Sequence, residues 1–572
     1  MGQPDHSTGV REKAMTLSPI DVEILRNQLN GIVEEAYIAL MQSAYSTNIK
    51  ERRDHSAALF DAVGRAVVQG ESLPLHLASI LGLVRLVLHR YGAQGVRPGD
   101  MFVSNDPFVG KGSHLPDVAI VAPVFCGDRL ALFVGNIAHH ADIGGMAPGS
   151  MAGGMTEVFQ EGLRIPPIRL VSGGEIVRDV FDMILLNVRV PEERLGDYMA
   201  QIAANRLAER RCHELFRRQS LAHIEAGIEE IIAGTERRVR ASIARLPDGE
   251  YRFADIMDDD GLGKRDIPIA VSIEIRGEEM TVDFTGSSPQ VLGNINVSEA
   301  GLQACVLFVI KSLIDPDAQS NHGTLAPVRI VAPSGTIVNA AFPAATAARA
   351  NTAQRIIEVM YGALAEAIPQ RVTAAGNGST TIAAFSGHGP DGRYYLYLEV
   401  VAGGAGARSY KDGTDGVQVL VTNTTNLPIE ALESEYPLLV ERYELVPDSG
   451  GAGTWRGGLG MRRVYRAIDH TLNFSGQADR FLNRPWGLFG GEPGETGSYT
   501  IVHDDGRREP LAVKPPTVAV PPSAVIEVVT TGAGGYGLPA SRARAKLDED
   551  CRSGKFSAEF LRKHYGYRPD GR

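Results

Sequence analysis

The chain of 572 residues has only four cysteines, Cys126, Cys212, Cys305 and Cys551. No two of them have the close spacing of a zinc knuckle or a thioredoxin-like redox site, so we expect reduced thiols and no disulfide framework. The chain also lacks an apolar run approaching the roughly 20 residues that span a bilayer. Its first residues lack the apolar core of a secretory signal. We therefore expect a cytoplasmic protein without a membrane segment.

Excess positive charge is also missing. There are 57 Lys and Arg residues against 68 Asp and Glu residues, which gives a formal net charge of -11 and a pI near 5.8. Nucleic-acid-binding proteins carry clustered basic surfaces. We therefore expect small-molecule or protein partners and no nucleic acid.

A nucleotide-binding loop is absent as well. The stretch GAGGYG at 532–537 matches the letters of the dinucleotide-binding fingerprint. Pro539 follows at once, and the remaining residues are too few for the helix, second strand and distant acid that such a site needs. The glycine-rich stretches 403–408 and 448–463 lack the Gly-Lys-Ser/Thr ending of a phosphate loop. We interpret all three stretches as turns or close backbone packing.

The composition is that of an ordinary folded protein, with 44% hydrophobic and 22% charged residues. Helical spacing predicts a helix from Pro19 to about Tyr45, a buried apolar helix over 73–92, and two antiparallel helices or an interface arm between 192 and 245. Short alternating strands follow, interrupted by helices at about 297–314 and 351–367. We predict a multidomain α+β fold with mixed helices and antiparallel sheets, and with a Gly-rich, β-dominated C-terminal half.

Composition shifts also predict where the domains divide. The predicted units are a disordered tail (1–17), an N-terminal α+β domain containing a metal-site hairpin and long helices (18–247), a central α+β domain (248–430), and a Gly-rich β region with terminal helices (431–572).

Two β-prone runs, 117–125 and 130–138, flank a Gly-Asp turn and predict a hairpin. A three-residue loop, 127–129, places Asp117 opposite His139, at a Cβ separation of about 4.5 to 5.5 Å. A two-residue loop would shift this register.

His114 lies three residues before Asp117, across a Leu-Pro pair that disfavours a helix. His114, Asp117 and His139 can therefore converge. Two neutral imidazoles and a carboxylate suit a divalent metal such as zinc, manganese or iron, and three protein ligands leave positions open for water or substrate. The alternative is that all three are ordinary polar groups at strand ends.

Three neighbouring polar residues are further candidates. His140 is expected to point away from His139 and could orient a ligand from behind. Asp106 or Asp142 could fix the tautomer of an imidazole. For these residues, stabilisation of turns is an equally good interpretation.

Seven stretches in collinear order, between about Ser18 and Tyr567, carry a family resemblance. They are STNIKERRDHSAALFDAVGRAV, SNDPFVGKGSHLPD, AHHADIGGMAPGS, EGLRIPPIRL, VPDSGGAGTWRGGLG, RPWGLFGGEPG and TGAGGYGLP. Together they resemble the B subunit of the N-methylhydantoinase and 5-oxoprolinase family. Subunits of the acetone and acetophenone carboxylases are related to it.

This resemblance implies a partner and a cofactor. The partner would be a hydantoinase A-type subunit of actin-like ATPase fold, which binds ATP and phosphorylates a carbonyl oxygen, so a hetero-oligomer is expected. The cofactor would be a divalent metal (Mn, Zn or Fe) held by a His-x-x-Asp pair and a later histidine, which match His114, Asp117 and His139. The segment 342–355 is richer in alanine than the family pattern, so no substrate contact is carried over to it.

The implied activity is ATP-dependent ring opening of a cyclic amide such as a hydantoin, 5-oxoproline or a lactam. This chain would provide metal-assisted hydrolysis of the phosphorylated carbonyl. Asp106, His140 or Glu161 is expected to transfer the proton, and His76 is expected to line the pocket. Two alternatives stay open: ATP-dependent carboxylation of a ketone, of the acetone or acetophenone type, and a non-catalytic scaffold for the ATPase subunit.

Overall fold

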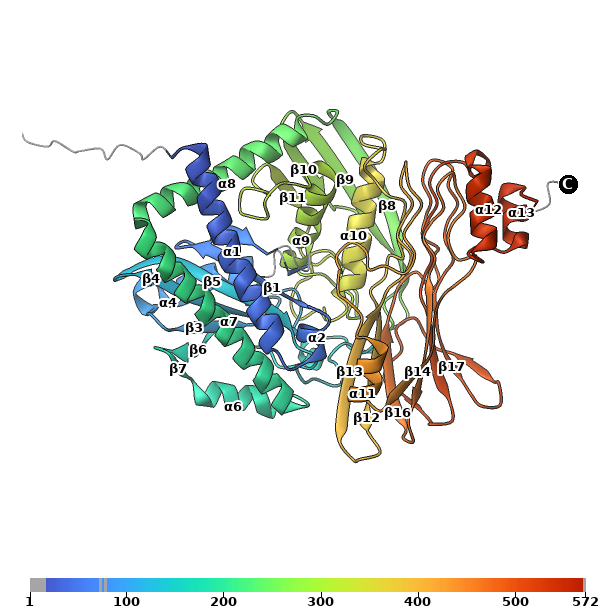
Figure 1. Ribbon diagram of the computed structural model, residues 1–572, viewed down its shortest axis with the longest axis horizontal. Coiled ribbons are helices and arrows are strands. Elements are labelled where there is room, and N and C mark those ends of the chain that lie inside the picture. The colour runs from blue at the N-terminus through green and yellow to red at the C-terminus, as the bar shows by residue number, and fades with distance from the viewer. Residues whose placement is uncertain (1–16, 71–74, 77–79, 569–572) are drawn as a thin grey trace, which may run out of the picture.

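The computed structural model describes residues 17–70, 75, 76 and 80–568, and Figure 1 labels its helices and strands. The predicted disordered tail, residues 1–17, falls outside this part of the chain apart from Leu17. Within the described ranges, no helix combines the length and the apolar character that crossing a membrane requires.

The N-terminal part is built on a seven-stranded antiparallel sheet in the order β2-β1-β5-β4-β3-β6-β7. The strands are β1 (His55–Asp61), β2 (Ala66–Gln69), β3 (Met101–Ser104), β4 (Asp117–Cys126), β5 (Arg129–His139), β6 (Ile168–Ser172) and β7 (Glu175–Ile176). The two central strands, β4 and β5, are buried along their length except near their turn. They therefore read as continuous apolar runs in the sequence.

Helices cover both faces of this sheet (Figure 1). One face packs against α1 (Pro19–Ser43), α7 (Pro191–Arg218) and α8 (Leu221–Ile243), and the other packs against α4 (Leu81–Tyr91). Three short helices, α2 (Thr47–Lys50), α5 (Val158–Glu161) and α6 (Arg178–Leu186), lie in the connections. Helix α1 confirms the predicted first long helix, and α7 and α8 confirm that the stretch 192–245 is helical. Whether it forms an antiparallel pair or an interface arm stays a prediction.

Alternation along β4 and β5 decides which side chains meet. Val118 and Ile120 belong to the core under α1 and α7, whereas Ala119 and Val121 belong to the core under α4. Successive side chains of a strand point to opposite faces. Asp117 and His139 therefore share the α4 face, and the residue after His139 points to the α7 face.

The expectation for the apolar stretch 73–92 is only partly met. A helix is present as α4, but it begins at Leu81, and residues 73, 74 and 77–79 of the stretch lie outside the described part of the chain. The stretch was expected to be buried on most sides. This is wrong for α4, because Arg85, His89 and Arg90 are exposed and only one face of the helix contacts the sheet.

The central part contains a four-stranded sheet in the order β11-β10-β9-β8. Its strands are β8 (Gly249–Asp259), β9 (Arg265–Arg276), β10 (Glu279–Asp283) and β11 (Val328–Val331), with β10 and β11 parallel. It packs against α9 (Glu299–Val309), which continues as a π-helical turn to Ile314, and against α10 (Arg349–Leu364). Every residue of α10 is buried, because this helix lies between the central sheet and the C-terminal part (Figure 1).

The C-terminal part contains two antiparallel sheets that share one hydrophobic core. One sheet consists of β12 (Thr381–His388), β13 (Tyr394–Val401), β16 (Leu472–Gln477) and β19 (Val518–Val520). The other consists of β14 (Leu438–Leu445), β15 (Met461–Ala467), β17 (Ser498–Val502), β18 (Arg508–Pro510) and β20 (Val525–Val529). The remaining helices are α11 (Ile429–Glu435), α12 (Arg544–Arg552) and α13 (Ala558–Tyr565).

The glycine-rich segments form a bundle of extended chains between these sheets and α12 (Figure 1). Three successive N–H groups, of Ala533, Gly534 and Gly535, donate to carbonyl oxygens of three different segments, those of Gly458, Ala375 and Glu492. Such packing leaves no room for side chains: a Cβ built on Gly457 would lie 1.8 Å from a backbone oxygen. The GAGGYG stretch is therefore a packing element, and the described chain continues after its glycines into a three-residue 3-10 helix, Pro539–Ser541, where a dinucleotide site needs a full α-helix.

The predicted fold class is confirmed, since helices and several antiparallel sheets occur together and the glycine-rich half is dominated by strands. The predicted helices at 297–314 and 351–367 correspond to α9 with its π-helical turn and to α10. The proposed divisions at 247 and 430 stay predictions.

Candidate metal centre

The hairpin of β4 and β5 pairs Asp117 with His139, as the sequence predicted. The predicted three-residue loop is wrong, because Cys126 pairs with Arg129 and only two residues form the turn. A β-bulge close to the turn leaves Ala131 without a partner and absorbs the one-residue shift. The register at the open end of the hairpin is therefore the predicted one, although the turn is shorter.

His114 joins this pair through a turn in which the Asp117 N–H donates to the His114 carbonyl oxygen (3.2 Å). His114 Nε2 lies 3.1 Å from Asp117 Oδ1, and the ring centroids of His114 and His139 are 5.1 Å apart. One possible ligand atom from each of the three residues lies within 4.8 Å of the others. We call these residues the His–Asp–His cluster. Their exposed fractions are 0%, 1% and 6%, so bulk solvent is largely excluded.

The electrostatics of the cluster favour the protonation states that bind metal. Burial lowers the pKa of His114, and Arg349 lowers it further. Burial also lowers the pKa of His139 well below its usual value, so both rings are neutral. Burial opposes ionisation of Asp117, but the permanently charged Arg349 contributes to surroundings that hold the pKa of Asp117 well below its usual value.

The hydrogen bonds of the cluster also suit metal binding, because they fix the tautomer of His114. His114 Nδ1 lies 2.9 Å from the carbonyl oxygen of Ala347, which can only accept, so the proton resides on Nδ1 and Nε2 keeps its lone pair. That buried Nε2 makes no hydrogen bond within the described residues, and its lone pair faces Asp117 Oδ1 at 3.1 Å. Buried polar atoms are normally paired, so this atom points to a missing ligand. Two imidazoles and one carboxylate suit Zn, Mn or Fe better than Mg or Ca.

Four residues outside the predicted ligand set surround Asp117. Arg349 Nη2 donates to Asp117 Oδ2 at 2.6 Å, and Ser113 Oγ lies 2.5 Å from the same oxygen. His76 Nε2 lies 3.3 Å from Asp117 Oδ1 and 3.6 Å from Asp54 Oδ1. His76 thus contacts the cluster but is not among the residues that line the cavity beside it, and its place in a substrate pocket stays a prediction. Asp54 lies in one of the stretches that carry the family resemblance, and Arg349 in the alanine-rich segment, but neither was assigned a role from the sequence.

The alanine-rich segment 342–355, to which no contact was carried over, reaches the cluster. It supplies the carbonyl oxygen of Ala347 to His114 and the guanidinium of Arg349 to Asp117. Small side chains there allow the segment to enter a buried site. The segment therefore contributes to the site although its alanine-rich sequence departs from the family pattern.

Asp106 and Asp142 are both committed to turns. Asp106 Oδ1 accepts from two backbone N–H groups (2.8 and 2.6 Å), and its Oδ2 accepts from Arg164 (2.6 Å). Asp142 accepts from the N–H of Gly144 (2.9 Å) and from Arg189 (2.9 Å). These contacts agree with the turn-stabilising interpretation of both residues.

His140 points to the α7 face, as expected from strand alternation. Its Nε2 lies 3.0 Å from Gln201 Oε1, and its ring packs against Tyr198 with centroids 4.5 Å apart. These contacts fasten the end of β5 to α7. A proton-transfer role for His140 or Asp106 stays a prediction, and their contacts favour a supporting role.

Glu161 contacts the backbone segment that holds His114 in place. It is fully buried, and its Oε1 accepts from the N–H groups of Thr346 (2.6 Å) and Ala347 (2.7 Å). Burial raises the pKa of Glu161 to about 8, so the carboxyl group is protonated at neutral pH. Glu161 thereby holds the backbone whose carbonyl group orients His114. Its role in proton transfer also stays a prediction.

A cavity of about 40 Å³ adjoins the cluster. Its polar walls include His139, Arg349, Asp54, Thr380 and Thr424, and its apolar walls come from Leu75, Met151, Ile382, Leu398, Val400 and Val421. The Asp54 Oδ1 atom and the two threonine hydroxyls are buried and have no hydrogen-bond partner among the described residues. These atoms are available to a ligand, and the space accommodates a few waters at roughly 10 to 15 Å³ each.

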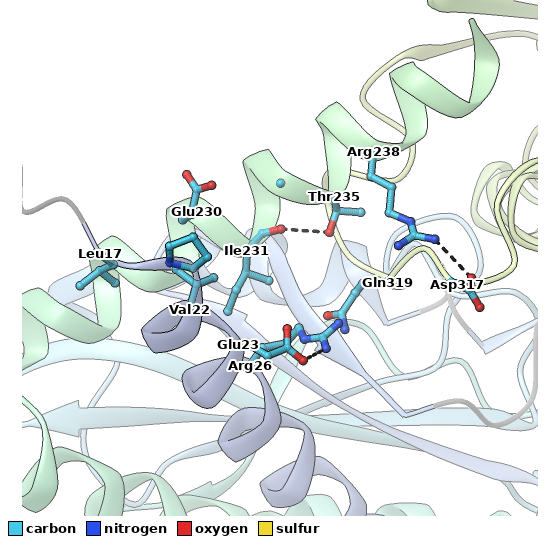
Figure 2. Close-up of a pocket in the computed structure, with 12 residues that line it drawn as sticks. Leu17, Val22, Glu23, Arg26, Glu230, Ile231, Thr235, Arg238, Asp317 and Gln319 are labelled. Atoms are coloured by element: carbon cyan, nitrogen blue, oxygen red, sulfur yellow. Dashed lines mark hydrogen bonds and ion pairs between the residues drawn. The ribbon is translucent and has the colours of Figure 1, made fainter. Parts of the chain in front are cut away.

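A larger pocket of about 260 Å³ lies between the start of α1 and α8 (Figure 2). It shares no residue with the cluster. Its charged groups are already paired: Arg238 pairs with Asp317, Arg26 with Glu23, and Glu230 with Arg237 outside the pocket. This pocket therefore offers no free charge or metal ligand comparable to the cluster.

Comparisons with known proteins identify the relatives of this chain. The sequence profile of hydantoinase B/oxoprolinase matches residues 18–539. The caprolactamase subunit beta of Pseudomonas jessenii is 32% identical, over 97% of this chain and 97% of the relative. 5-oxoprolinase 1 of Arabidopsis thaliana is 32% identical over 91% of this chain, which matches 42% of that protein.

Solved structures show the same fold. The ATP-dependent caprolactamase from Pseudomonas jessenii superposes with a TM-score of 0.91 and 30% identity, over 98% of both chains. Acetone carboxylase superposes with a TM-score of 0.89 over 96% of this chain and 79% of its own, at 18% identity, a likeness of fold alone. With its sequence profile and its near full-length relatives in agreement, this chain belongs to the hydantoinase B/oxoprolinase family.

Proposed function

We propose that this chain is the hydrolytic subunit of an ATP-dependent cyclic-amide hydrolase that opens a hydantoin, 5-oxoproline or lactam ring. A partner ATPase subunit of the hydantoinase A type would phosphorylate the carbonyl oxygen, and this chain would hydrolyse the activated carbonyl. The observation that carries the proposal is the buried His–Asp–His cluster beside a cavity with unpaired polar atoms. The names of the caprolactamase and 5-oxoprolinase relatives support the cyclic-amide class.

His114, Asp117 and His139 would hold a divalent cation, Mn, Zn or Fe. When bound, the cation supplies a Lewis acid that polarises a carbonyl group or acidifies water at neutral pH. Arg349 keeps Asp117 ionised, and the Ala347 carbonyl keeps the proton of His114 on the nitrogen that faces away from the cluster.

The cavity of about 40 Å³ has to widen to admit a ring, and its residues would then bind and orient the substrate. The hydroxyl groups of Thr380 and Thr424 can donate to the ring amide or the phosphate, because neither has another partner among the described residues. Burial raises the pKa of Asp54, and its Oδ1 lines the cavity, so Asp54 can hold a proton and release it to the departing ring nitrogen. The apolar walls exclude water, which strengthens each of these polar contacts.

The test combines metal analysis with an activity assay of the chain purified with its ATPase partner. We expect close to one metal per chain, lost in His139→Ala and retained in His89→Ala, which removes an exposed imidazole of α4. ATP-dependent ring opening should disappear with the metal. A chain without stoichiometric metal, or with full activity in His139→Ala, would refute the proposal and favour the scaffold alternative.

The same preparation separates hydrolysis from carboxylation. Ring opening of hydantoin, 5-oxoproline and simple lactams is compared with bicarbonate-dependent consumption of acetone and acetophenone. Activity only with a ketone and bicarbonate would replace the hydrolase proposal by the carboxylase alternative.

A further inference from the structure

The His–Asp–His cluster is buried, so a substrate needs a route to it. A cavity of about 10 Å³ lies directly behind it, walled by Ser56, Gln69, Gly70 and His76 among others. The imidazole of His76 separates this cavity from the cluster, because Nδ1 lies 3.1 Å from Ser56 Oγ and Nε2 lies 3.3 Å from Asp117 Oδ1. We call this small cavity the passage.

Two larger pockets meet the passage at Gln69. The first, of about 580 Å³, is a groove walled by α4, the end of β2, α9 and β11, and we call it the α4–α9 groove. The second, of about 400 Å³, lies between α1 and residues 319–320 and shares both Gln69 and Gly70 with the passage. Both volumes lie in the range of roughly 300 to 1,000 Å³ that is typical of small-molecule sites.

The charges of the two pockets differ in sign. Within the described part of the chain, the α4–α9 groove is lined by Arg85 and Lys111 and by one acid, Glu299, which pairs with Lys111 at 2.7 Å. Among the described residues that line the pocket beside α1, Glu34 alone carries a formal charge. An anion is therefore favoured in the α4–α9 groove and repelled from the other pocket.

We propose that the α4–α9 groove receives an anionic, phosphorylated substrate and that Gln69, Gly70 and His76 form its route to the metal cluster. This inference rests on the proposed function, in which the carbonyl is phosphorylated on the partner subunit and hydrolysed here. The passage holds about one water in this conformation, so the side chains of Gln69 and His76 rotate to admit a ring. The mouth of the groove is then the side that faces the ATPase subunit.

Gly70 offers a way to block the passage. A Cβ added there would lie 3.5 Å from Val33 Cγ1 and 3.7 Å from the Ala57 oxygen, which are ordinary contact distances. Gly70→Leu should therefore fold and fill the passage. Gly31→Leu, on α1 with nothing within 4 Å of the added Cβ, is the matched control.

The first measurement follows access to the metal without activity. The chain is loaded with Co²⁺, and its removal by the chelator dipicolinate is followed by visible absorption. Gly70→Leu should slow removal at least tenfold with unchanged Co²⁺ affinity, and Gly31→Leu should match the native chain. An unchanged removal rate in a folded, cobalt-binding Gly70→Leu protein would overturn the route. Should Gly70→Leu fail to fold, Gly70→Ala carries the test, with a two- to threefold slowing expected.

The second measurement tests the mouth in the complex with the ATPase subunit. Arg85→Gln should lower the ring-opened product formed per ATP several-fold, more so at low salt, whereas Glu34→Gln should not. The opposite pattern would place the entrance beside α1 and overturn the α4–α9 groove. Failure of the cluster to bind Co²⁺ at all would instead refute the proposed function, so the two failures are distinguishable.

Discussion

The buried carboxyl group of Glu161 makes a pH-dependent contribution to stability that Glu161→Gln removes. Burial raises the pKa of Glu161 from 4.5 to about 8, against two backbone N–H groups that favour the ionised form. Between pH 4.5 and pH 8 the folded protein keeps a proton that the unfolded chain has released. The free energy of unfolding therefore falls as pH rises, by about 1.4 kcal/mol per pH unit and about 5 kcal/mol over the window.

Glu161→Gln keeps an oxygen that can accept from Thr346 and Ala347 but does not titrate. Melting temperatures of the metal-free native chain and of the variant are compared from pH 5 to pH 8.5. The two melting temperatures should be similar near pH 5. As the pH rises to 8, the melting temperature of the variant should rise steadily relative to that of the native chain. For a cooperative unit of 150 to 250 residues, about 5 kcal/mol corresponds to about 10 to 20 °C.

Glu157→Gln is the control, because it makes the same chemical change on an exposed residue at the start of α5. Its melting temperature should follow that of the native chain at every pH. A difference between Glu161→Gln and the native chain that does not change with pH would refute the raised pKa. The dry environment assigned to the carboxyl group behind the cluster would then be wrong.

Three further changes test other parts of the site and the fold. Arg349→Met should destabilise the metal-free chain by about 3 to 5 kcal/mol, because it leaves Asp117 as an unpaired buried charge. Added metal should restore part of the melting temperature, and an equal loss of melting temperature with and without metal would contradict this. Asp54→Asn should keep the metal content measured by elemental analysis but lower turnover about 100-fold or more, and unchanged turnover would remove Asp54 from proton transfer. Gly457→Ala should lower the melting temperature strongly because its Cβ would clash with a backbone oxygen at 1.8 Å, whereas Gly31→Ala in open space on α1 should not.

The parts of the fold that follow a local period could be predicted from the sequence. The first helix shows apolar residues at helical spacing and a capping box at Ser18, and both features depend only on neighbouring residues. The turn of the β4–β5 hairpin was less predictable, because a bulge and a shorter loop give the same register as a longer loop without a bulge. The glycine bundle was not predictable in form, since its hydrogen bonds join segments far apart in the chain.

The cluster could be predicted because it depends on residues that are close in the chain: its three members belong to one hairpin and the turn before it. The groups that tune it could not. Asp54 comes from the start of the sheet and Arg349 from the start of α10, and each looks like an ordinary charged residue in its local sequence. Only the burial of Arg349 beside Asp117, 232 positions away, reveals its role.

The charges around the cluster decide which ligand a metal-loaded site prefers. Arg52, which also lines the cavity beside the cluster, and Arg349 are permanently positive. Asp117 is held ionised, and burial favours the neutral form of Asp54. With both histidines neutral, a divalent cation leaves a surplus of positive charge in a place of low dielectric constant, where electrostatic interactions are strong. An anion gains more from such a site than an unmodified amide does. Phosphorylation thus turns the carbonyl oxygen into a good leaving group. It also gives the substrate the negative charge that this buried site attracts.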